Sequence, residues 1–326
     1  MSSEGDPFLA SEYGILQVIP GHKGDVRSVS PYPGGGVLTG SSDKTSKLYL
    51  PEDKNNQHSE LQEVQNFLGP TEFVTSICCG KTKAGELEIY VGSHDSHIYI
   101  YTLIEGKPTA TLSRHSDRVC TLAFRICDDE DVLVSGSWDQ TAVIWRNREP
   151  AVTLYGHVHA IWDVAFVARS FILTAGADKS IKKWDVKDGS MLHIYNGHSD
   201  CVRGLAVISG QQFLSCSNDQ TVILWTIGGD ILKQFTAHEN FIYDIAIVRQ
   251  PLQPGVEPPK NRPFKIVTVS EDKTLRVWDK DGNMLQTIPI QSSTLWSIAA
   301  LDNGNFVIGT SDGITYIFSN VKPISK

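Results

Sequence analysis

Short apolar runs separated by Gly, Asp and Asn follow one another along the whole chain. Examples are AIWDVAFV at 160–167, FILTAGA at 171–177 and CVRGLAVI at 201–208. These runs are rich in β-branched and aromatic residues and end at turn-forming residues, which is the pattern of short β-strands. No stretch longer than a few residues has the period of an amphipathic helix. The pattern therefore predicts an all-β fold.

One polar–apolar motif occurs seven times along the chain. The copies are TGSSDKTSKLY (39–49), VGSHDSHIYIY (91–101), SGSWDQTAVIW (135–145), AGADKSIKKW (175–184), SCSNDQTVILW (215–225), VSEDKTLRVW (269–278) and GTSDGITYIF (309–318). Successive spacings of 52, 44, 39, 41, 53 and 40 residues separate the turn aspartates Asp43, Asp95, Asp139, Asp178, Asp219, Asp272 and Asp312. A period near 40 to 45 residues is typical of propeller blades with four antiparallel strands each.

A second landmark precedes most copies of the motif. It is a Gly-His pair or a relative of one, at Gly21-His22, Arg114-His115, Gly156-His157, Gly197-His198 and Ala237-His238. In three copies the histidine and the turn aspartate are 21 residues apart, which suits two short strands and their turns. The combined pattern, GH followed by SxDxTxxxW, resembles a seven-bladed WD-repeat β-propeller. The last copy shows only three strands, so we expect GILQVI at 14–19 to supply the fourth and close the ring.

We expect one propeller domain over residues 13–320, a flexible N-terminal tail over 1–12 and a C-terminal tail over 321–326. Blades 2 and 7 lack the landmark histidine, and blade 7 ends in Phe318 where the motif has Trp, so their internal hydrogen bonds should be weaker. The proline-rich segment 249–265 falls between the first two strands of blade 6. We expect a mobile loop there, on the face opposite the turn aspartates, with a docked proline-rich motif as the alternative.

Composition and charge exclude several classes of function. The net charge of −8, with no block of five like charges, disfavours nucleic-acid binding. The N-terminal residues lack the features of a signal peptide, and no apolar run is long enough to span a membrane. The six cysteines are scattered without a C-x-x-C pair, which favours reduced thiols and gives no metal site. We expect a monomeric protein of the cytoplasm, or also of the nucleus, that binds no cofactor.

Ser, His and Asp recur within the repeats and raise the question of hydrolysis, because a nucleophile needs a base and an orienting carboxylate. One catalytic centre does not need so many copies, and no hydrolase, nucleotide-binding or zinc-protease motif occurs. The WD-repeat resemblance implies a structural role instead, in which the aspartate bonds the histidine and a Ser or Thr connects it to the strand tryptophan. We call this arrangement the latch, and its predicted members are His115, Asp139, Trp145, His157, Asp178, Trp184, His198, Asp219, Trp225, His238, Asp272 and Trp278.

The positions that flank the latches are expected to face solvent around the centre of one face, which we call the top face. These positions carry an unusual number of Trp, Tyr, Phe and Arg residues, the types that dominate binding hot spots. An exposed aromatic ring of this kind costs solubility unless a partner covers it. The sequence therefore predicts a protein-binding surface, and the alternative is that some rings pack beneath neighbouring loops.

Several blade sequences narrow the resemblance. SGSWDQTAVIW, HAIWDV, FLSCSNDQTVILW, HENFIYDI and the final STLWSI with GNFVIGTSDG resemble the N-terminal propeller of the phospholipase A-2-activating protein family and its fungal counterpart. This resemblance implies ubiquitin binding on the top face, within adaptors of a hexameric AAA+ unfoldase. The motif GHKGDVRSV makes Asp25 and Arg27 the leading contact candidates, and we extend the predicted site to Trp138, Trp162, Arg203, Asn218, Tyr243 and Trp296.

The resemblance also implies family domains for a second ubiquitin site and for unfoldase binding, which have no counterpart in this chain. We therefore do not expect the unfoldase to bind this chain alone. Two alternatives to ubiquitin binding remain: recognition of another short peptide or phosphopeptide, and a purely architectural scaffold. A phosphate site needs convergent Arg and Lys residues, whereas the three arginines here come from blades 1, 3 and 5 with aromatic residues between them.

Overall fold

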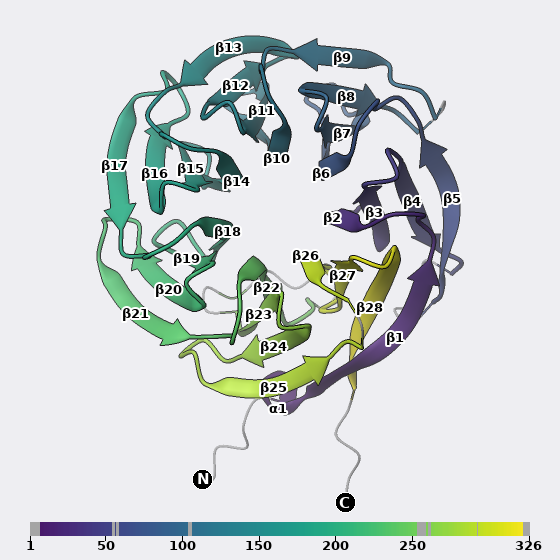
Figure 1. Cartoon of the computed structure of the whole chain (residues 1–326). Coiled ribbons are helices and arrows are strands. Elements are labelled where there is room, and N and C mark those ends of the chain that lie inside the picture. The colour runs from purple at the N-terminus through teal and green to yellow at the C-terminus, as the bar shows by residue number, and fades with distance from the viewer. Residues whose placement is uncertain are drawn as a thin grey trace, which may run out of the picture.

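Seven four-stranded antiparallel sheets surround a common axis in the computed structural model, which describes residues 7–53, 56, 59–103, 106–252, 259, 262–291 and 293–321 (Figure 1). The innermost strands of blades 1 to 7 are β2 (Val26–Tyr32), β6 (Val74–Lys81), β10 (Val119–Cys127), β14 (Ile161–Val167), β18 (Val202–Val207), β22 (Ile242–Arg249) and β26 (Leu295–Ala300). The second strands are β3 (Gly36–Ser41), β7 (Leu87–Ser93), β11 (Glu130–Ser137), β15 (Phe171–Gly176), β19 (Gln212–Ser217), β23 (Phe264–Ser270) and β27 (Phe306–Thr310). The predicted seven-bladed all-β propeller is confirmed.

The remaining strands form the outer half of each blade. The third strands are β4 (Ser46–Pro51), β8 (His97–Tyr101), β12 (Ala142–Arg146), β16 (Ser180–Asp185), β20 (Thr221–Thr226), β24 (Thr274–Trp278) and β28 (Ile314–Val321). The outermost strands are β5 (Leu61–Phe67), β9 (Ala110–Ser113), β13 (Glu149–Leu154), β17 (Met191–Asn196), β21 (Ile231–Thr236), β25 (Met284–Pro289) and β1 (Glu12–Pro20). The second strands are almost entirely buried, whereas most outermost strands are largely solvent-exposed, so hydrophobicity falls from the inside of each blade to its edge.

The hydrophobic core lies between the blades. One cluster, for example, joins Val132, Val134 and Ile144 of blade 3 to Ile172 and Trp184 of blade 4. Because every blade packs against two neighbours, no blade has to bury its apolar faces alone.

The N-terminal segment closes the ring, as predicted. Strand β1 pairs antiparallel with β28 from Glu12 opposite Val321 to Pro20 opposite Ile314, at the outer edge of blade 7 (Figure 1). A short helix, α1 (Pro7–Ala10), precedes β1 and buries Phe8. The fully buried Lys265 donates hydrogen bonds from Nζ to the carbonyl and hydroxyl oxygens of Ser11.

Both predicted tails need correction at their inner ends. The flexible tail expected over 1–12 does not extend over residues 7–12, because α1 buries Phe8 and Glu12 pairs with Val321 at the start of β1. Val321, the first residue of the predicted C-terminal tail, belongs to β28. Residues 1–6 and 322–326 lie outside the described residues, as do 253–258, 260 and 261 of the predicted proline-rich loop, which connects β22 to β23.

Side-chain to backbone hydrogen bonds tie neighbouring innermost strands together around the axis. The amide of Ile77 in blade 2 donates to Ser28 Oγ of blade 1 at 3.0 Å, and that of Val29 in blade 1 donates to Ser297 Oγ of blade 7 at 3.3 Å. The same type of bond links blade 3 to blade 4, blade 4 to blade 5 and blade 6 to blade 7. These bonds satisfy backbone donors at the inner edges of five sheets that would otherwise have no partner in the blade.

The latch is present in five blades. The His Nδ1 to Asp Oδ2 distance is 2.8–3.0 Å in the pairs His22–Asp43, His115–Asp139, His157–Asp178, His198–Asp219 and His238–Asp272. In each pair the other histidine nitrogen bonds a Ser or Thr hydroxyl at 2.7–2.8 Å. The indole N–H groups of Trp145, Trp184, Trp225 and Trp278 donate to the same hydroxyls at 2.8–3.0 Å. Each such network satisfies its buried polar groups while joining two loops of one blade.

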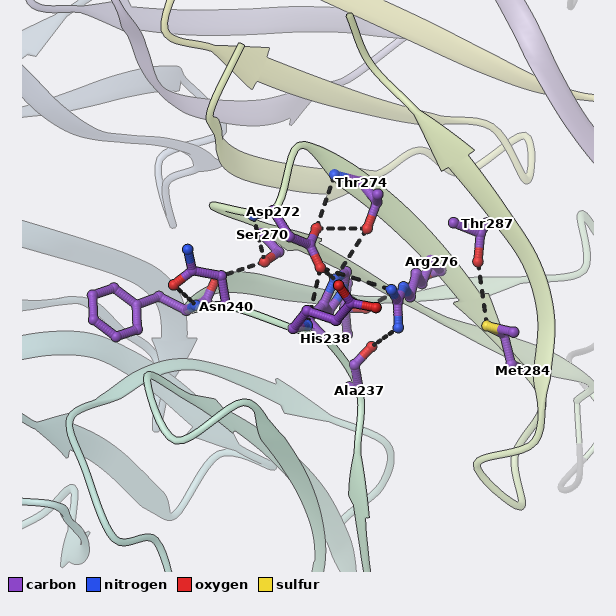
Figure 2. Close-up of polar contacts among 12 residues, drawn as sticks. Ala237, His238, Asn240, Ser270, Asp272, Thr274, Arg276, Met284 and Thr287 are labelled. Atoms are coloured by element: carbon purple, nitrogen blue, oxygen red, sulfur yellow. Dashed lines mark hydrogen bonds and ion pairs between the residues drawn. The ribbon is translucent and has the colours of Figure 1, made fainter. Parts of the chain in front are cut away.

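Figure 2 shows the latch of blade 6, where the carboxylate of Asp272 lies between His238 and Thr274. One carboxylate oxygen contacts His238, and the other accepts hydrogen bonds from the backbone amide and the hydroxyl of Thr274. Arg276 adds an ion pair to Asp272 at 3.8 Å and donates to the carbonyl of Ala237. The aspartate is thus held on both oxygens, which explains why burial does not leave it protonated.

Blade 2 has a different set of partners for its turn aspartate. Oδ2 of Asp95 accepts hydrogen bonds from the backbone amide and hydroxyl of Thr71 and from the hydroxyl of Tyr99. In blade 7, Asp312 accepts a hydrogen bond from Thr310. Among the described residues neither network has a histidine at the landmark position, although Nδ1 of His97, two residues after Asp95, lies 3.6 Å from Asp95 Oδ1. The expected weakness of both latches stays a prediction.

The latches predict a sensitivity to acid. Hydrogen bonds to His157 and Ser180 hold the pKa of Asp178 far below its usual value despite the desolvation that burial imposes. A carboxylate whose pKa is lowered by folding stabilises the protein above its unfolded pKa, and this contribution is lost as pH falls below about 4. We expect Asp178→Asn to lower the melting temperature at pH 7 by about 5 °C or more and to reduce the further fall between pH 5 and pH 3.

Thermal unfolding followed by circular dichroism at pH 7, 5 and 3 measures both effects. The exposed Asp128 makes Asp128→Asn a matched control, and this variant should follow the wild-type curve. An Asp178→Asn protein with wild-type stability at pH 7 would show that the latch is not a stabilising element.

Candidate protein-binding surface

Each innermost strand contains a β-bulge near its top end. The pairing register shifts between the first and third residues of the strand in all seven blades. The residues at the seven bulges are Arg27, Thr75, Cys120, Trp162, Arg203, Tyr243 and Trp296. A bulge leaves one residue outside the ladder and redirects its side chain. In this protein the bulges direct side chains of all seven blades into one space.

That space is a cavity of about 590 Å³ at the centre of the top face, lined by all seven bulge residues. Phe73, His94, Arg118 and Trp138 also line it. The cavity therefore mixes aromatic rings with guanidinium groups.

Seven of these side chains form one chain of contacts, which we call the cation–aromatic stack. Its members, in order around the ring, are Arg27, Trp296, Tyr243, Arg203, Trp162, Trp138 and Arg118. The stack passes from blade 1 back through blades 7, 6, 5 and 4 to blade 3, so it joins residues from both ends of the chain. Contacts of this kind contribute about 0.5–1 kcal/mol each at exposed sites and more when desolvated.

Arg203 occupies the middle of the stack. Its guanidinium carbon lies 4.0 Å from the ring centroid of Trp162 and 5.5 Å from that of Tyr243, and its Nε donates to Asn218 at 2.9 Å. Burial, followed by Glu271, raises the pKa of Tyr243 to about 12, so its hydroxyl is neutral at physiological pH. Arg203 is therefore held by two aromatic faces and one amide oxygen.

Arg27 occupies one end of the stack. Its guanidinium carbon lies 3.8 Å over the ring of Trp296, and its Nη2 forms an ion pair with Asp25 at 2.8 Å. The structure thus brings together Asp25, Arg27 and Trp296 as one group that spans blades 1 and 7. All eight predicted contact residues lie on the top face, although Asp25 and Asn218 hold arginines in place and do not line the cavity.

The exposure of the aromatic residues differs from the prediction. Trp138 is 36% exposed, whereas Trp162, Tyr243 and Trp296 are half-buried. The reason is that guanidinium groups or neighbouring rings cover their faces. The alternative that some of these rings are packed and not open to solvent is therefore correct in part. A binding partner would contact the edges of the rings and the guanidinium groups of the arginines.

Two carboxylates in the cavity were missed by sequence reasoning. Asp163 and Asp244 line it at the residue that follows the bulge in blades 4 and 6. Burial, with the charge of Asp244 as a further cause, raises the pKa of Asp163 to about 7, and burial raises the pKa of Asp244 to about 6. The only signal in the sequence is the shared pattern of IWDV and IYDI, in which Asp follows an aromatic residue.

The latch geometry also answers the question of hydrolysis. His115 contacts Asp139 and Ser135 as a catalytic histidine would contact its partners. Ser135, however, is fully buried, and its oxygen accepts a hydrogen bond from the indole N–H of Trp145. A nucleophile must reach a substrate carbon, and this hydroxyl cannot. In the described part of the chain no group of three or more His, Cys, Asp or Glu side chains is arranged to hold a metal ion, and no helix is long and apolar enough to cross a membrane.

The protein is a closed propeller with a cavity rich in aromatic and arginine side chains at the centre of its top face. This combination is typical of a protein-interaction domain. The family described as WD domain, G-beta repeat matches residues 14–49, 106–146, 148–185, 189–226 and 229–279. The chain belongs to this WD-repeat family and, within it, to the group of the phospholipase A-2-activating protein and Doa1 propellers.

Three similar proteins support this assignment. The chain is 29% identical to the ubiquitin fusion degradation protein 3 homolog of Caenorhabditis elegans over 95% of its length, and 37% identical to phospholipase A-2-activating protein of Xenopus laevis over 50%. These matches cover 36% and 20% of the two relatives, so the chain spans about a third or less of their length. The solved structure of the WD40 beta propeller domain of Doa1 aligns with a TM-score of 0.81 at 31% identity, covering 95% of this chain and 98% of the Doa1 chain.

Proposed function

We propose that this propeller binds ubiquitin on its top face and serves as the non-catalytic recognition domain of an adaptor for ubiquitylated proteins in the cytoplasm and nucleus. The observation that carries the proposal is the cation–aromatic stack around the central cavity. Residues of these types dominate protein-binding hot spots, and Trp138 remains 36% exposed while it lines the cavity. The name of the Caenorhabditis elegans relative, ubiquitin fusion degradation protein 3 homolog, supports ubiquitin as that partner.

The carboxylates beside the stack fit the proposed ligand, whereas the stack itself carries three arginines. Ubiquitin's recognition patch is apolar with basic neighbours, and the stack offers aromatic edges with the carboxylates of Asp25 and Glu271 beside them. Opposite charges at the rim of an interface favour correct orientation and faster association. We propose no contact between the propeller itself and the AAA+ unfoldase.

A phosphopeptide fits the same surface less well. Arg27, Arg118 and Arg203 all line the cavity, but each guanidinium covers an aromatic ring, and Arg27 already pairs with Asp25. A phosphate group would have to compete with these contacts for arginine donors.

Titration of ¹⁵N-labelled ubiquitin with this chain tests the proposal. We expect saturable shifts confined to the apolar patch and its basic neighbours, with a dissociation constant of tens to hundreds of micromolar, as is usual for a small interface. Lys83, on the loop between β6 and β7 at the other end of the blade, is 59% exposed, and Lys83→Ala should leave the affinity unchanged. If the ubiquitin signals do not shift at millimolar concentrations of the propeller, ubiquitin binding is contradicted.

A further inference from the structure

One backbone hydrogen bond joins the two top loops of every blade. The amide of the residue before the turn aspartate donates to the carbonyl oxygen of the residue two positions before the bulge, at 2.8–3.0 Å in all seven blades. We call the two residues joined by this bond the rim pair. Because the same bond recurs, the rim pairs occupy equivalent places around the top face. Three of them are Phe73–His94 in blade 2, Arg118–Trp138 in blade 3 and Phe241–Glu271 in blade 6.

Exposed aromatic rings occur at two opposite sides of this rim. Phe73, Trp138 and Phe241 are all exposed, and each belongs to a rim pair. Blade 6 lies across the ring from blades 2 and 3 (Figure 1). The rim pairs of the other four blades have small or polar side chains, and Asp25 is the one charged residue among them. A partner of the top face would therefore meet apolar surface on the side of blades 2 and 3 and again at blade 6.

The ring of Phe241 is more open than the rings on the opposite side. Phe73 contacts the imidazole of His94, and the guanidinium of Arg118 covers Trp138. Phe241 is 39% exposed, and in the described part of the chain no aromatic ring or cation is stacked on it. Phe241 thus offers a partner an uncovered aromatic ring.

The backbone of Phe241 is held on both sides. Its carbonyl oxygen accepts hydrogen bonds from the amide of Glu271 at 3.0 Å and from the hydroxyl of Ser270 at 2.8 Å. Its amide donates to Oδ1 of Asn240 at 2.8 Å. Because the loop is already ordered, a partner that covers the ring would pay little conformational entropy for it.

The second residue of this rim pair is an acid without a cation. Glu271 is half-buried, and its Oε2 is buried and accepts no hydrogen bond from the described residues. After burial, Glu271 is the next cause of the raised pKa of Tyr243, so its carboxylate lies beside the stack. No Lys, Arg or His side chain within the described ranges forms an ion pair with Glu271. A buried carboxylate oxygen without a partner is costly, and a cation supplied by a bound protein would relieve that cost.

Asp25, the other acid among the rim pairs, already has a cation. Its Oδ2 lies 2.8 Å from Nη2 of Arg27, which also covers Trp296. A basic group of a partner would have to share Asp25 with Arg27, whereas it would meet no competing cation at Glu271. Glu271 is therefore better placed than Asp25 to form an ion pair with a partner.

We propose that Phe241 and Glu271 form the contact that orients ubiquitin on the top face. Phe241 packs against the apolar patch of ubiquitin, and Glu271 pairs with one Lys or Arg side chain beside that patch. The inference rests on the proposed function for the identity of this partner. Arg118 lies on the opposite side of the face and would repel the same basic group, so the reversed orientation is disfavoured.

The first experiment measures the affinity of variants by titration of ¹⁵N-labelled ubiquitin. We expect Phe241→Ala to weaken binding about tenfold, as for an aromatic hot spot, and Glu271→Gln to weaken it about threefold. Leu285, exposed on β25 of the same blade, provides the control Leu285→Ala. Asp117, an exposed acid next to Arg118, provides the charge control Asp117→Asn. Both controls should keep the wild-type affinity, and the melting temperature of each variant shows whether it is folded.

A charge exchange tests the ion pair directly. The basic residues that border the apolar patch of ubiquitin are replaced by Glu one at a time, and each variant is titrated with wild-type and Glu271→Lys propeller. We expect Glu271→Lys to bind wild-type ubiquitin about tenfold more weakly, because like charges then face each other. One of the ubiquitin variants should recover at least threefold of this loss with Glu271→Lys. The same ubiquitin variant should gain nothing with Asp117→Lys.

The outcomes separate this inference from the proposed function. Wild-type affinity in both Phe241→Ala and Glu271→Gln would overturn the inference and leave ubiquitin binding intact. Failure of every ubiquitin variant to recover affinity with Glu271→Lys would also overturn it. If the wild-type propeller binds no ubiquitin at all, the proposed function and the inference fall together. Should Phe241→Ala not fold, the near-isosteric Glu271→Gln and the charge exchange still decide the result.

Discussion

Replacement of Trp145 by alanine should lower the free energy of unfolding by about 3–5 kcal/mol, the usual cost of removing a large aromatic side chain from a core. Trp145 is 2% exposed and packs with residues of blades 2 and 3. Its indole N–H also donates to Ser135, which in turn bonds His115. The substitution thus creates a cavity and leaves a buried hydroxyl with one bond fewer.

Denaturant titration followed by fluorescence and circular dichroism measures the loss. Trp138 lies seven residues earlier in the same motif and is 36% exposed, which makes Trp138→Ala the matched control. Because Trp138 contributes to the stack and not to the latch, its loss should cost about 1 kcal/mol or less. Equal destabilisation by the two substitutions would contradict the division of the motif into a structural and a surface tryptophan.

The double substitution Arg27→Ala with Trp296→Ala should weaken ubiquitin binding by about tenfold or more, since hot-spot Arg and Trp residues each contribute about 2 kcal/mol. Arg27 covers the ring of Trp296 at 3.8 Å and pairs with Asp25, so loss of both side chains removes one end of the stack and frees the carboxylate. The two residues are in contact, and each single substitution should already show much of the effect.

Chemical-shift titration with labelled ubiquitin measures the change in affinity, and the melting temperature confirms that the variant is folded. Arg125, exposed on β10, provides the control Arg125→Ala, for which wild-type binding is expected. Unchanged ubiquitin affinity in the double variant would show that the site lies elsewhere on the propeller.

Much of the fold was predictable because the same sequence motif occurs once in each blade. The histidine, the aspartate and the tryptophan of one latch lie within one motif unit, and their spacing is visible in a single sequence. The His157–Asp178 pair, for example, was expected from a separation of 21 residues and is present at 2.8 Å. The packing of α1 and the burial of Lys265 left no such signal, because they depend on contacts between segments far apart in the chain.

The candidate site was predictable only as a set of positions. The sequence indicated which residues flank the latches, but it did not show that Arg203 lies between Trp162 and Tyr243 or that Arg27 covers Trp296. It also gave no reason to connect Asp163 with Asp244, which are 81 residues apart.

The amino-acid sequence by itself determined the number of blades, the latch within most of them and the aromatic and basic character of the top face, because these features depend on residues close together in the chain. Only the tertiary structure decided which of the top-face residues contact one another and that Asp163 and Asp244 line the same cavity. Those contacts join residues of different blades, and they depend on the closure of the ring and on the direction that each β-bulge gives to its side chain.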